Sequence, residues 1–211
     1  MVTPSSMSHH FSPAEIASLL EKAEHLKIEG NHKGALDILE KVLLEDPENT
    51  TALEEVADNE LSLEHYRRAE AAAKRAIALD ATSYTGQYIL GFLRSRAGEW
   101  KKAVEHLQEA NRYKANNAEI LRCLGWALFN DGQRLQGIVT LERALNLEED
   151  NPFILCDLGV AYLHLQNFSK AKALFIHARD IDPNNVRVQE CIQAVERLEK
   201  EYSGKIPEKT K

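Results

Sequence analysis

Three cysteines are the side chains best suited to covalent chemistry, and one of them stands in an unusual segment. Cys123 lies in LRCLGWALFNDG, residues 121–132, beside Trp126, one of two tryptophans in the chain. A thiolate held near a base could act there as a nucleophile. However, no histidine or aspartate partner recurs with Cys123, and a free cysteine in a helical protein is usually a small buried hydrophobe. We therefore expect Cys123 to pack in a core.

The other chemistry-bearing residues also lack the arrangement that catalysis or metal binding needs. His9 and His10 form too short a cluster to specify a metal. His164 and His177 fall on different predicted helices without a shared ligand. The sequence shows no glycine-rich phosphate loop, and we expect its carboxylates on solvated helix faces. The sequence thus predicts a protein that is not an enzyme and takes no cofactor and no metal.

Composition narrows the partners and the compartment. The 211 residues include 44% apolar and 28% charged residues, which is ordinary soluble composition. The net charge of −7 argues against nucleic acid as a partner, because phosphate backbones are bound by clustered Lys and Arg. The chain has three cysteines, Cys123, Cys156 and Cys191. Their number is odd and their spacing is not that of a disulfide framework, which indicates free thiols in a reducing compartment. With no signal-peptide pattern and no apolar run approaching ~18 residues, we expect a cytoplasmic location without membrane insertion.

The elements that must position these residues follow from an internal repeat of 34 residues. One column of small residues holds Ala23, Ala57, Gly91, Gly125 and Gly159. A second column, twelve places later, holds Ala35, Ala69, Ala103, Gly137 and Ala171. Within each unit the apolar residues are spaced by 3, 4 and 7, which is typical of amphipathic helices, and breakers such as EGNHKG (29–34) divide the unit in two. Each unit is therefore predicted to be a pair of antiparallel helices that approach closely at the small residues.

This pattern resembles the tetratricopeptide repeat, which carries small residues at these positions of a 34-residue unit. The matching segments include LGFLRSRAGEWKKAVEHLQEA (90–110) and LGVAYLHLQNFSKAKALFIHA (158–178), with Pro47 and Pro183 at the family's proline position. The resemblance implies an all-α, right-handed superhelical solenoid of five helix pairs and a C-terminal capping helix. The repeats are placed at 16–49, 50–83, 84–117, 118–151 and 152–185, within a domain of residues 12–185.

The ends of the array are predicted from local signals. SPAE, residues 12–15, is a capping box with Pro13 at the first helical position, so the first helix is expected to begin there. Residues 186–202 form an amphipathic segment, which we predict to be the terminal capping helix that stacked repeats need. Leu198 belongs to its apolar face, which is expected to pack against the last repeat. Residues 1–11 and 203–211 are expected to be flexible tails. Charged residues such as Glu60 at usually apolar positions predict looser packing in the first units.

In this family the first helices of the pairs line a concave groove, so the resemblance also implies which side chains face a ligand. The predicted binding patch spans the third and fourth units, and Phe153 lies close to it. Aromatic residues and arginine carry much of the binding energy at interfaces. The four residues of the patch are Tyr88, Phe92, Arg122 and Trp126, and Phe153 is counted with them as a residue of the predicted binding groove.

The N-terminal part of the groove is predicted to be acidic, with Glu54 and Asp58 among the residues that face it. Some family members grip a C-terminal carboxylate at these positions, and acidic side chains would repel one. The expected ligand is therefore an extended or helical protein segment with apolar anchors, and with basic residues toward the acidic end.

Three functions follow from these expectations. The first is a non-catalytic scaffold or adaptor that binds a peptide segment of a partner protein in the groove. The second is a self-assembling structural module, a homo-oligomer in which residues 1–13 are donated to a neighbour. The third is a secretion-type chaperone that holds an export substrate. Fold alone does not decide among them, because this architecture serves many pathways.

Overall fold

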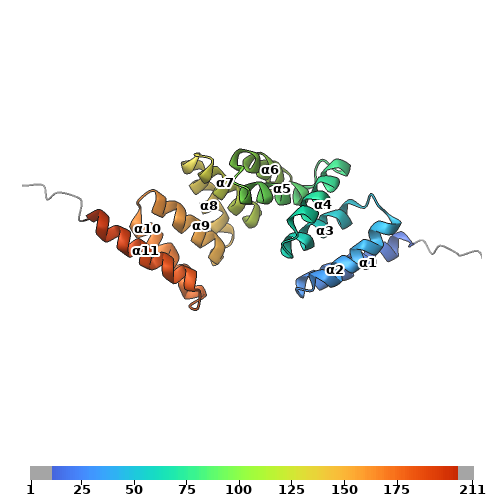
Figure 1. Cartoon of the computed structure of the whole chain (residues 1–211), viewed down its shortest axis with the longest axis horizontal. Coiled ribbons are helices and arrows are strands. Elements are labelled where there is room, and N and C mark those ends of the chain that lie inside the picture. Colours follow the sequence, from blue (N-terminus) through green and yellow to red (C-terminus); the bar gives the residue numbers. More distant parts are fainter. Residues whose placement is uncertain (1–10, 204–211) are drawn as a thin grey trace, which may run out of the picture. The chain divides into compact units, whose positions relative to one another are not determined.

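The structure, a computed structural model, describes residues 11–203, and this part of the chain consists of eleven α-helices joined by short turns (Figure 1). The first ten form five successive pairs, and α11 follows the last pair. The helices are α1 (Pro13–Ile28), α2 (His32–Glu45), α3 (Thr50–Ser62), α4 (Tyr66–Leu79), α5 (Tyr84–Arg96), α6 (Trp100–Tyr113), α7 (Ala118–Asn130), α8 (Arg134–Leu147), α9 (Pro152–His164), α10 (Phe168–Ile181) and α11 (Val186–Ser203). The predicted fold class, an all-α solenoid of five helix pairs with a capping helix, is confirmed.

The helices begin where side chains can satisfy the free backbone N–H groups of a first turn. At α1 the Ser12 side chain accepts a hydrogen bond from the Glu15 N–H, and the Glu15 carboxylate accepts one from the Ser12 N–H. This confirms the predicted capping box with Pro13 in the first turn. Five other helices begin after an asparagine whose side chain accepts from the first turn. These residues are Asn31, Asn49, Asn117, Asn151 and Asn167.

A residue in the left-handed backbone region ends the first helix of each pair, and it recurs every 34 residues. Three of the five are glycines, which adopt positive φ without steric cost. The other two, Glu64 and Gln166, take the same conformation with φ of 59°. The glycines are Gly30, Gly98 and Gly132. The repeat thus fixes the turn geometry even where the residue type is unfavourable.

The small-residue columns mark the places where paired helices touch, as predicted. A Cβ atom added at Gly137 would lie 2.6 Å from the backbone nitrogen of Phe129 and 2.7 Å from the carbonyl oxygen of Gly125. α8 therefore rests directly on the backbone of α7, and only glycine fits at Gly137. Ala23, Ala57, Ala69 and Ala103 in the same columns are fully buried.

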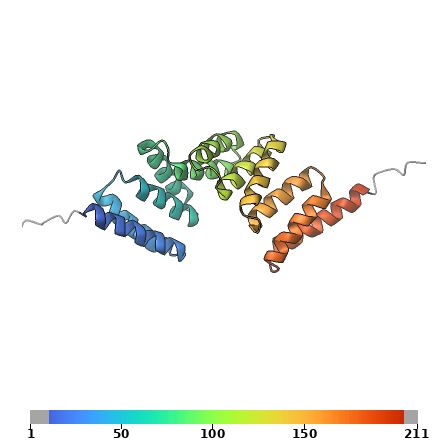
Figure 2. The same ribbon diagram turned by 180° about the vertical axis from the view of Figure 1, so that it is seen from behind.

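The chain divides into two compact units, Met1–Leu93 and Arg94–Lys211, and the structure describes residues 11–93 of the first and 94–203 of the second. We call these the N-terminal unit and the C-terminal unit; the boundary falls within α5. In the N-terminal unit α1 packs on α2, α2 on α3 and α3 on α4. In the C-terminal unit α6 to α11 pack consecutively, and α7 also contacts α9. Figure 2 shows the α7–α8 and α9–α10 pairs from behind.

The core of the C-terminal unit contains large side chains that the capping helix covers. Phe129, Leu141, Leu155 and Phe175 form one buried cluster with Val188 and Val195 of α11. Burying each such side chain stabilises the fold by about 1.5–3 kcal/mol. The flexible tails expected at residues 1–11 and 203–211 lie outside the described residues except for residues 11 and 203, and Ser203 still belongs to α11.

Some carboxylates depart from the expected solvated positions, and Glu60 is the most buried of them. Glu60 of α3 is only 1% exposed, and its oxygens lie 2.7 Å from Nδ1 of His65 and 3.0 Å from Nε of Arg68. Asp157 of α9 is another and belongs to the site described below. Glu60 therefore does not loosen its repeat, because its carboxylate joins the end of α3 to the start of α4.

Candidate functional site

Cys123 is a core residue, as expected from the sequence. It is buried in α7, and its Sγ lies 3.4 Å from Oε1 of Glu119 and 3.6 Å from Nη2 of Arg122. Burial raises the pKa of Cys123 far above its ordinary value, so its thiol stays protonated. Burial also raises the pKa of Cys156 to about 11. Neither thiol has the lowered pKa of a nucleophile.

Arg122 connects α7 to α9 through carboxylates on both helices. Its Nε and Nη2 donate to Glu119 at 2.8 and 2.7 Å, and its Nη1 donates to Asp157 at 2.6 Å. Loss of hydration on burial raises the pKa of Asp157, and the facing guanidinium opposes that shift. The sequence predicted that the Arg122 side chain faces a ligand. In the structure its charge is balanced by carboxylates of the protein itself.

The Arg122 guanidinium also lies over an exposed aromatic ring. Its Cζ atom is 6.0 Å from the centroid of the Phe153 ring, within cation–π range. Phe153 stands at the start of α9 and is 69% exposed, although it is a large apolar side chain. The predicted juxtaposition of Arg122 and Phe153 is therefore present.

Further along α7, aromatic contacts lead from Trp126 to α9. The half-buried Trp126 ring stacks on Phe129, with centroids 6.3 Å apart and planes inclined by 14°. Phe129 in turn lies 5.9 Å from the ring of His164, the last residue of α9. We call the face of α7 and α9 that carries Arg122, Trp126, Phe153 and His164 the α7–α9 surface.

Tyr88 and Phe92, the other aromatic residues of the predicted patch, belong to the N-terminal unit. Both are half-buried on α5, and their ring centroids are 6.4 Å apart with planes tilted by 42°. The structure thus brings Tyr88 together with Phe92, and Arg122 together with Phe153.

The predicted acidic residues of the N-terminal unit are partly neutralised. Nζ of Lys27 in α1 lies 3.2 Å from Asp58 and 2.7 Å from the neighbouring Glu55. Glu54 accepts a hydrogen bond from the Ser83 hydroxyl, and burial raises the pKa of Glu54 above its ordinary value. The contact of Lys27 with these carboxylates was not predicted from the sequence, because Lys27 comes from the preceding repeat and the contact depends on how the helices stack.

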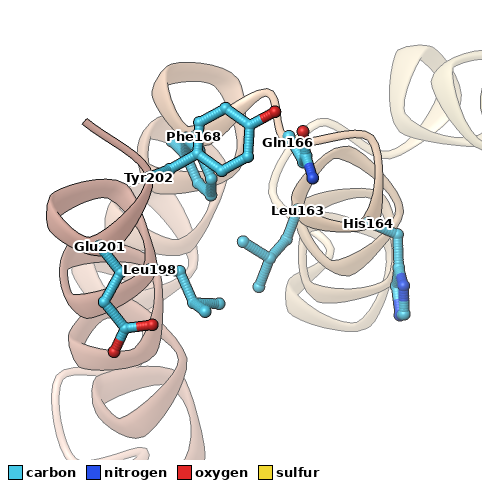
Figure 3. A pocket seen from close by; sticks show the side chains of 7 residues that line it. All are labelled: Leu163, His164, Gln166, Phe168, Leu198, Glu201 and Tyr202. Carbon is cyan, nitrogen blue, oxygen red and sulfur yellow. The ribbon is translucent and has the colours of Figure 1, made fainter. Parts of the chain in front are cut away.

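The sequence reasoning also missed a pocket at the capping helix. The pocket has a volume of about 380 Å³ and lies between α9, α10 and α11, and Phe168 and Tyr202 form part of its wall with ring centroids 5.8 Å apart (Figure 3). Leu198, which was expected to pack inward, is 41% exposed at its edge. His164 lines this pocket and also contacts Phe129, so the pocket adjoins the α7–α9 surface. The available signal was Tyr202, one turn beyond Leu198 on the same face of α11.

Within residues 11–203, no group of three or more His, Cys, Asp or Glu side chains could hold a metal ion. In the same part of the chain, no helix is both long enough and apolar enough to cross a membrane.

Comparison with known proteins agrees with this architecture. Residues 154–185 match the tetratricopeptide repeat. The chain is 29% identical over 98 residues to anaphase-promoting complex subunit 3 of Schizosaccharomyces pombe, a match that covers 45% of this chain and 15% of that protein. The chain therefore corresponds to a small part of the length of this relative.

Solved structures share the fold at low sequence identity. A thermophilic tetratricopeptide-repeat protein of Thermus thermophilus is similar with a TM-score of 0.66 and 23% identity, over 86% of this chain and 99% of that one. YrrB, described as having an unusual peptide-binding site, is similar with a TM-score of 0.62 and 21% identity, over 83% and 90%.

A chain of the APC/C hetero-tetramer Cut9–Hcn1 is similar with a TM-score of 0.80 and 18% identity, over 90% of this chain and 37% of that one. Tetratricopeptide-repeat domains are generally protein–protein interaction modules and typically non-catalytic. Residues 154–185 thus match a tetratricopeptide repeat, and the five helix pairs with α11 have the fold of tetratricopeptide-repeat proteins.

Proposed function

We propose that this chain is a non-catalytic adaptor that binds a peptide segment of a partner protein on the α7–α9 surface. The observation that carries the proposal is the exposed Phe153 ring, held against Arg122 while Arg122 is itself fixed by Asp157 and Glu119. An exposed aromatic ring supported in this way can bind with little further loss of side-chain freedom.

The neighbouring residues extend the surface in both directions. Trp126 stacks on Phe129, which leads to His164 and the pocket at α11. On the other side, Phe153 follows a run of three acidic residues, which line an open hollow beside it. These residues are Glu148, Glu149 and Asp150. A ligand with an aromatic or aliphatic anchor and an adjacent Lys or Arg fits this arrangement.

The basic residues of the ligand are thus proposed to lie beside Phe153, in the C-terminal unit. The sequence had placed them toward Glu54 and Asp58, where Lys27 already supplies a positive charge. The proposal is supported by two proteins of the same fold, YrrB with its peptide-binding site and the chain of the Cut9–Hcn1 hetero-tetramer.

A peptide-display selection on the immobilised full chain tests the proposal without a known partner. We expect the selected peptides to share an apolar anchor flanked by Lys or Arg. Their affinity for wild type is then compared with Phe153→Ala by fluorescence anisotropy, and we expect at least a ~10-fold loss.

The matched control is Leu135→Ala, which removes an exposed leucine from the second helix of a pair, α8. Affinity should be unchanged in this variant. Equal binding by wild type and Phe153→Ala, or equal losses in the two variants, would show that the α7–α9 surface is not the site.

A further inference from the structure

The exposed Phe153 ring and the pocket at the capping helix lie along one face of α9. Phe153 is the second residue of this helix, and His164, which lines the pocket, is its last. A separation of eleven positions makes three helical turns and leaves the two side chains only about 20° apart around the axis, at a distance of about 16 Å along it. The Phe153 ring and the His164 edge of the pocket therefore belong to the same face of one helix.

The middle of this face offers little to a ligand. Asp157 and Val160 lie on the same stripe, four and seven positions after Phe153. The Asp157 carboxylate accepts a hydrogen bond from Arg122, and Val160 is half-buried and packs against the core of the C-terminal unit. The exposed apolar features of the stripe are therefore concentrated at its two ends.

The pocket can take one large apolar side chain. Its volume of about 380 Å³ would hold about a dozen water molecules. The side chains of Leu163 and Leu198 point toward each other from α9 and α11, beside the rings of Phe168 and Tyr202 (Figure 3). An apolar side chain that enters this hollow removes largely apolar walls from water.

Carboxylates accompany both ends of the face. Glu148 and Glu149 line the hollow beside Phe153, and Glu201 lines the pocket. The positive charge of Arg122 does not offset them, because Glu119 and Asp157 already bind its guanidinium. A ligand that reaches both ends is therefore favoured by a basic residue next to each of its contacts.

We infer that the partner segment binds in an extended conformation through two apolar anchors six positions apart, one on Phe153 and one in the pocket at α11, each next to a Lys or Arg. Alternate side chains of an extended chain point the same way and each residue advances about 3.3 Å, so six positions span about 20 Å. This length reaches from Phe153 past His164 into the pocket. The inference rests on the proposed function, because it assigns a second contact to the same ligand.

Two arguments favour this form of ligand. A helical segment binds through anchors on successive turns, and the middle of the α9 face lacks exposed apolar side chains to receive them. In an extended segment, binding of the first anchor holds the second at an effective concentration on the order of millimolar, so a single side chain in the pocket adds appreciably to the affinity.

The test is a display library of peptides with two Trp or Leu anchors, each followed by Lys, separated by Gly/Ser spacers of different lengths. On the immobilised full chain we expect anchors six positions apart to be enriched about ten-fold over shorter and longer spacings. Selection on Tyr202→Ala should lose this preference. Selection on Tyr113→Ala, which removes an exposed tyrosine from α6, should keep it. The absence of any preferred spacing, or a preference for eleven positions as in a helical ligand, would overturn the inference.

A double-variant cycle identifies the anchor that enters the pocket. Replacing that anchor by Ala in the enriched peptide should weaken binding to wild type about ten-fold and leave binding to Tyr202→Ala nearly unchanged, as measured by fluorescence anisotropy. Glu201→Lys, a change at an exposed position, should weaken binding of the enriched peptide about five-fold, and replacing the neighbouring ligand lysine by Ser should remove this effect.

Failure of this inference can be distinguished from failure of the proposed function. If Phe153→Ala weakens binding while Tyr202→Ala and Glu201→Lys do not, the segment binds through one anchor and the pocket takes no part. The inference is then wrong and the proposed function stands. If Phe153→Ala has no effect, the α7–α9 surface is not the site and both are wrong.

Discussion

Arg122 of α7 and Asp157 of α9 form an ion pair with a nitrogen–oxygen distance of 2.6 Å that joins the first helices of two successive repeats. Their side chains are 18% and 24% exposed, so most of both charges is removed from water. The same guanidinium binds Glu119 on its own helix and supports the Phe153 ring. One arginine thus stabilises the stacking of two repeats and also shapes the surface proposed to bind a partner.

Removal of the arginine should destabilise the C-terminal unit. Arg122→Ala leaves Asp157 and Glu119 close together without a cation, and we expect a loss of about 2–3 kcal/mol in the free energy of unfolding. The double variant Arg122→Met/Asp157→Leu should recover most of the loss, because it removes both buried charges. Urea titrations followed by circular dichroism measure both. An Arg122→Ala midpoint equal to that of wild type would show that the pair contributes little to stability.

The stability of the N-terminal unit should depend on pH through Glu54. Burial raises the folded-state pKa of Glu54 above its ordinary value of 4.5, so the folded protein holds the proton more strongly than the unfolded chain. The stabilisation from this group is therefore complete below that ordinary value and is lost as pH rises through the folded pKa. The stability of wild type relative to Glu54→Gln should therefore fall as the pH rises above the ordinary pKa of this carboxyl group.

Ser83→Ala provides the companion measurement, because the Ser83 hydroxyl donates to the ionised Glu54. Without this donor the Glu54 pKa should rise further, and the fall in stability should move to higher pH. Urea midpoints measured against pH for the three proteins would show this. A wild-type-to-Gln difference that is constant with pH would contradict the expectation.

The left-handed turn residue Glu64 offers a route to higher stability. It adopts φ of 59° at a position that Gly30, Gly98 and Gly132 occupy in other repeats. Glu64→Gly should remove the steric cost of this conformation and add about 0.5–1 kcal/mol, offset in part by greater freedom of the unfolded chain. Gly98→Ala at the equivalent turn should cost about 1 kcal/mol. Thermal denaturation should show midpoints that move in opposite directions, and midpoints that move together would refute the account.

The close approach of α7 and α8 should not tolerate a single added methyl group. In Gly137→Ala the new Cβ would meet the backbone of Phe129, which cannot rotate away as a side chain could. We expect a loss of about 2–3 kcal/mol. Ala171→Gly, in the same column of the next repeat, should lose about 1–2 kcal/mol, through helix propensity and the loss of one buried methyl group. If both changes cost the same, the contact at Gly137 is less tight than the structure indicates.

The fold was predictable because small residues recur in the sequence at the positions where paired helices make contact. Gly125 and Gly137 recur with alanines at a fixed spacing, and that spacing requires two helices to approach along it. The partners of single polar residues were not predictable. Glu60 pairs with His65 and Arg68, and Arg122 pairs with Asp157, only once the helices pack against one another. The pocket at Tyr202 was missed because the capping helix has no counterpart in the repeats with which its residues could be compared.

The consecutive packing of the helices has a consequence for how the protein is made. α1 to α4 pack in order along the chain, and so do α6 to α11, so most contacting residues are near one another in sequence. Such low contact order favours rapid folding, because little chain entropy is lost before each contact forms. During synthesis, α1 to α4 can bury Ala35, Leu39 and Ala57 in their cores while α9 to α11 are still being translated. Folding can therefore proceed from the N-terminus as the ribosome releases the chain, one helix pair at a time.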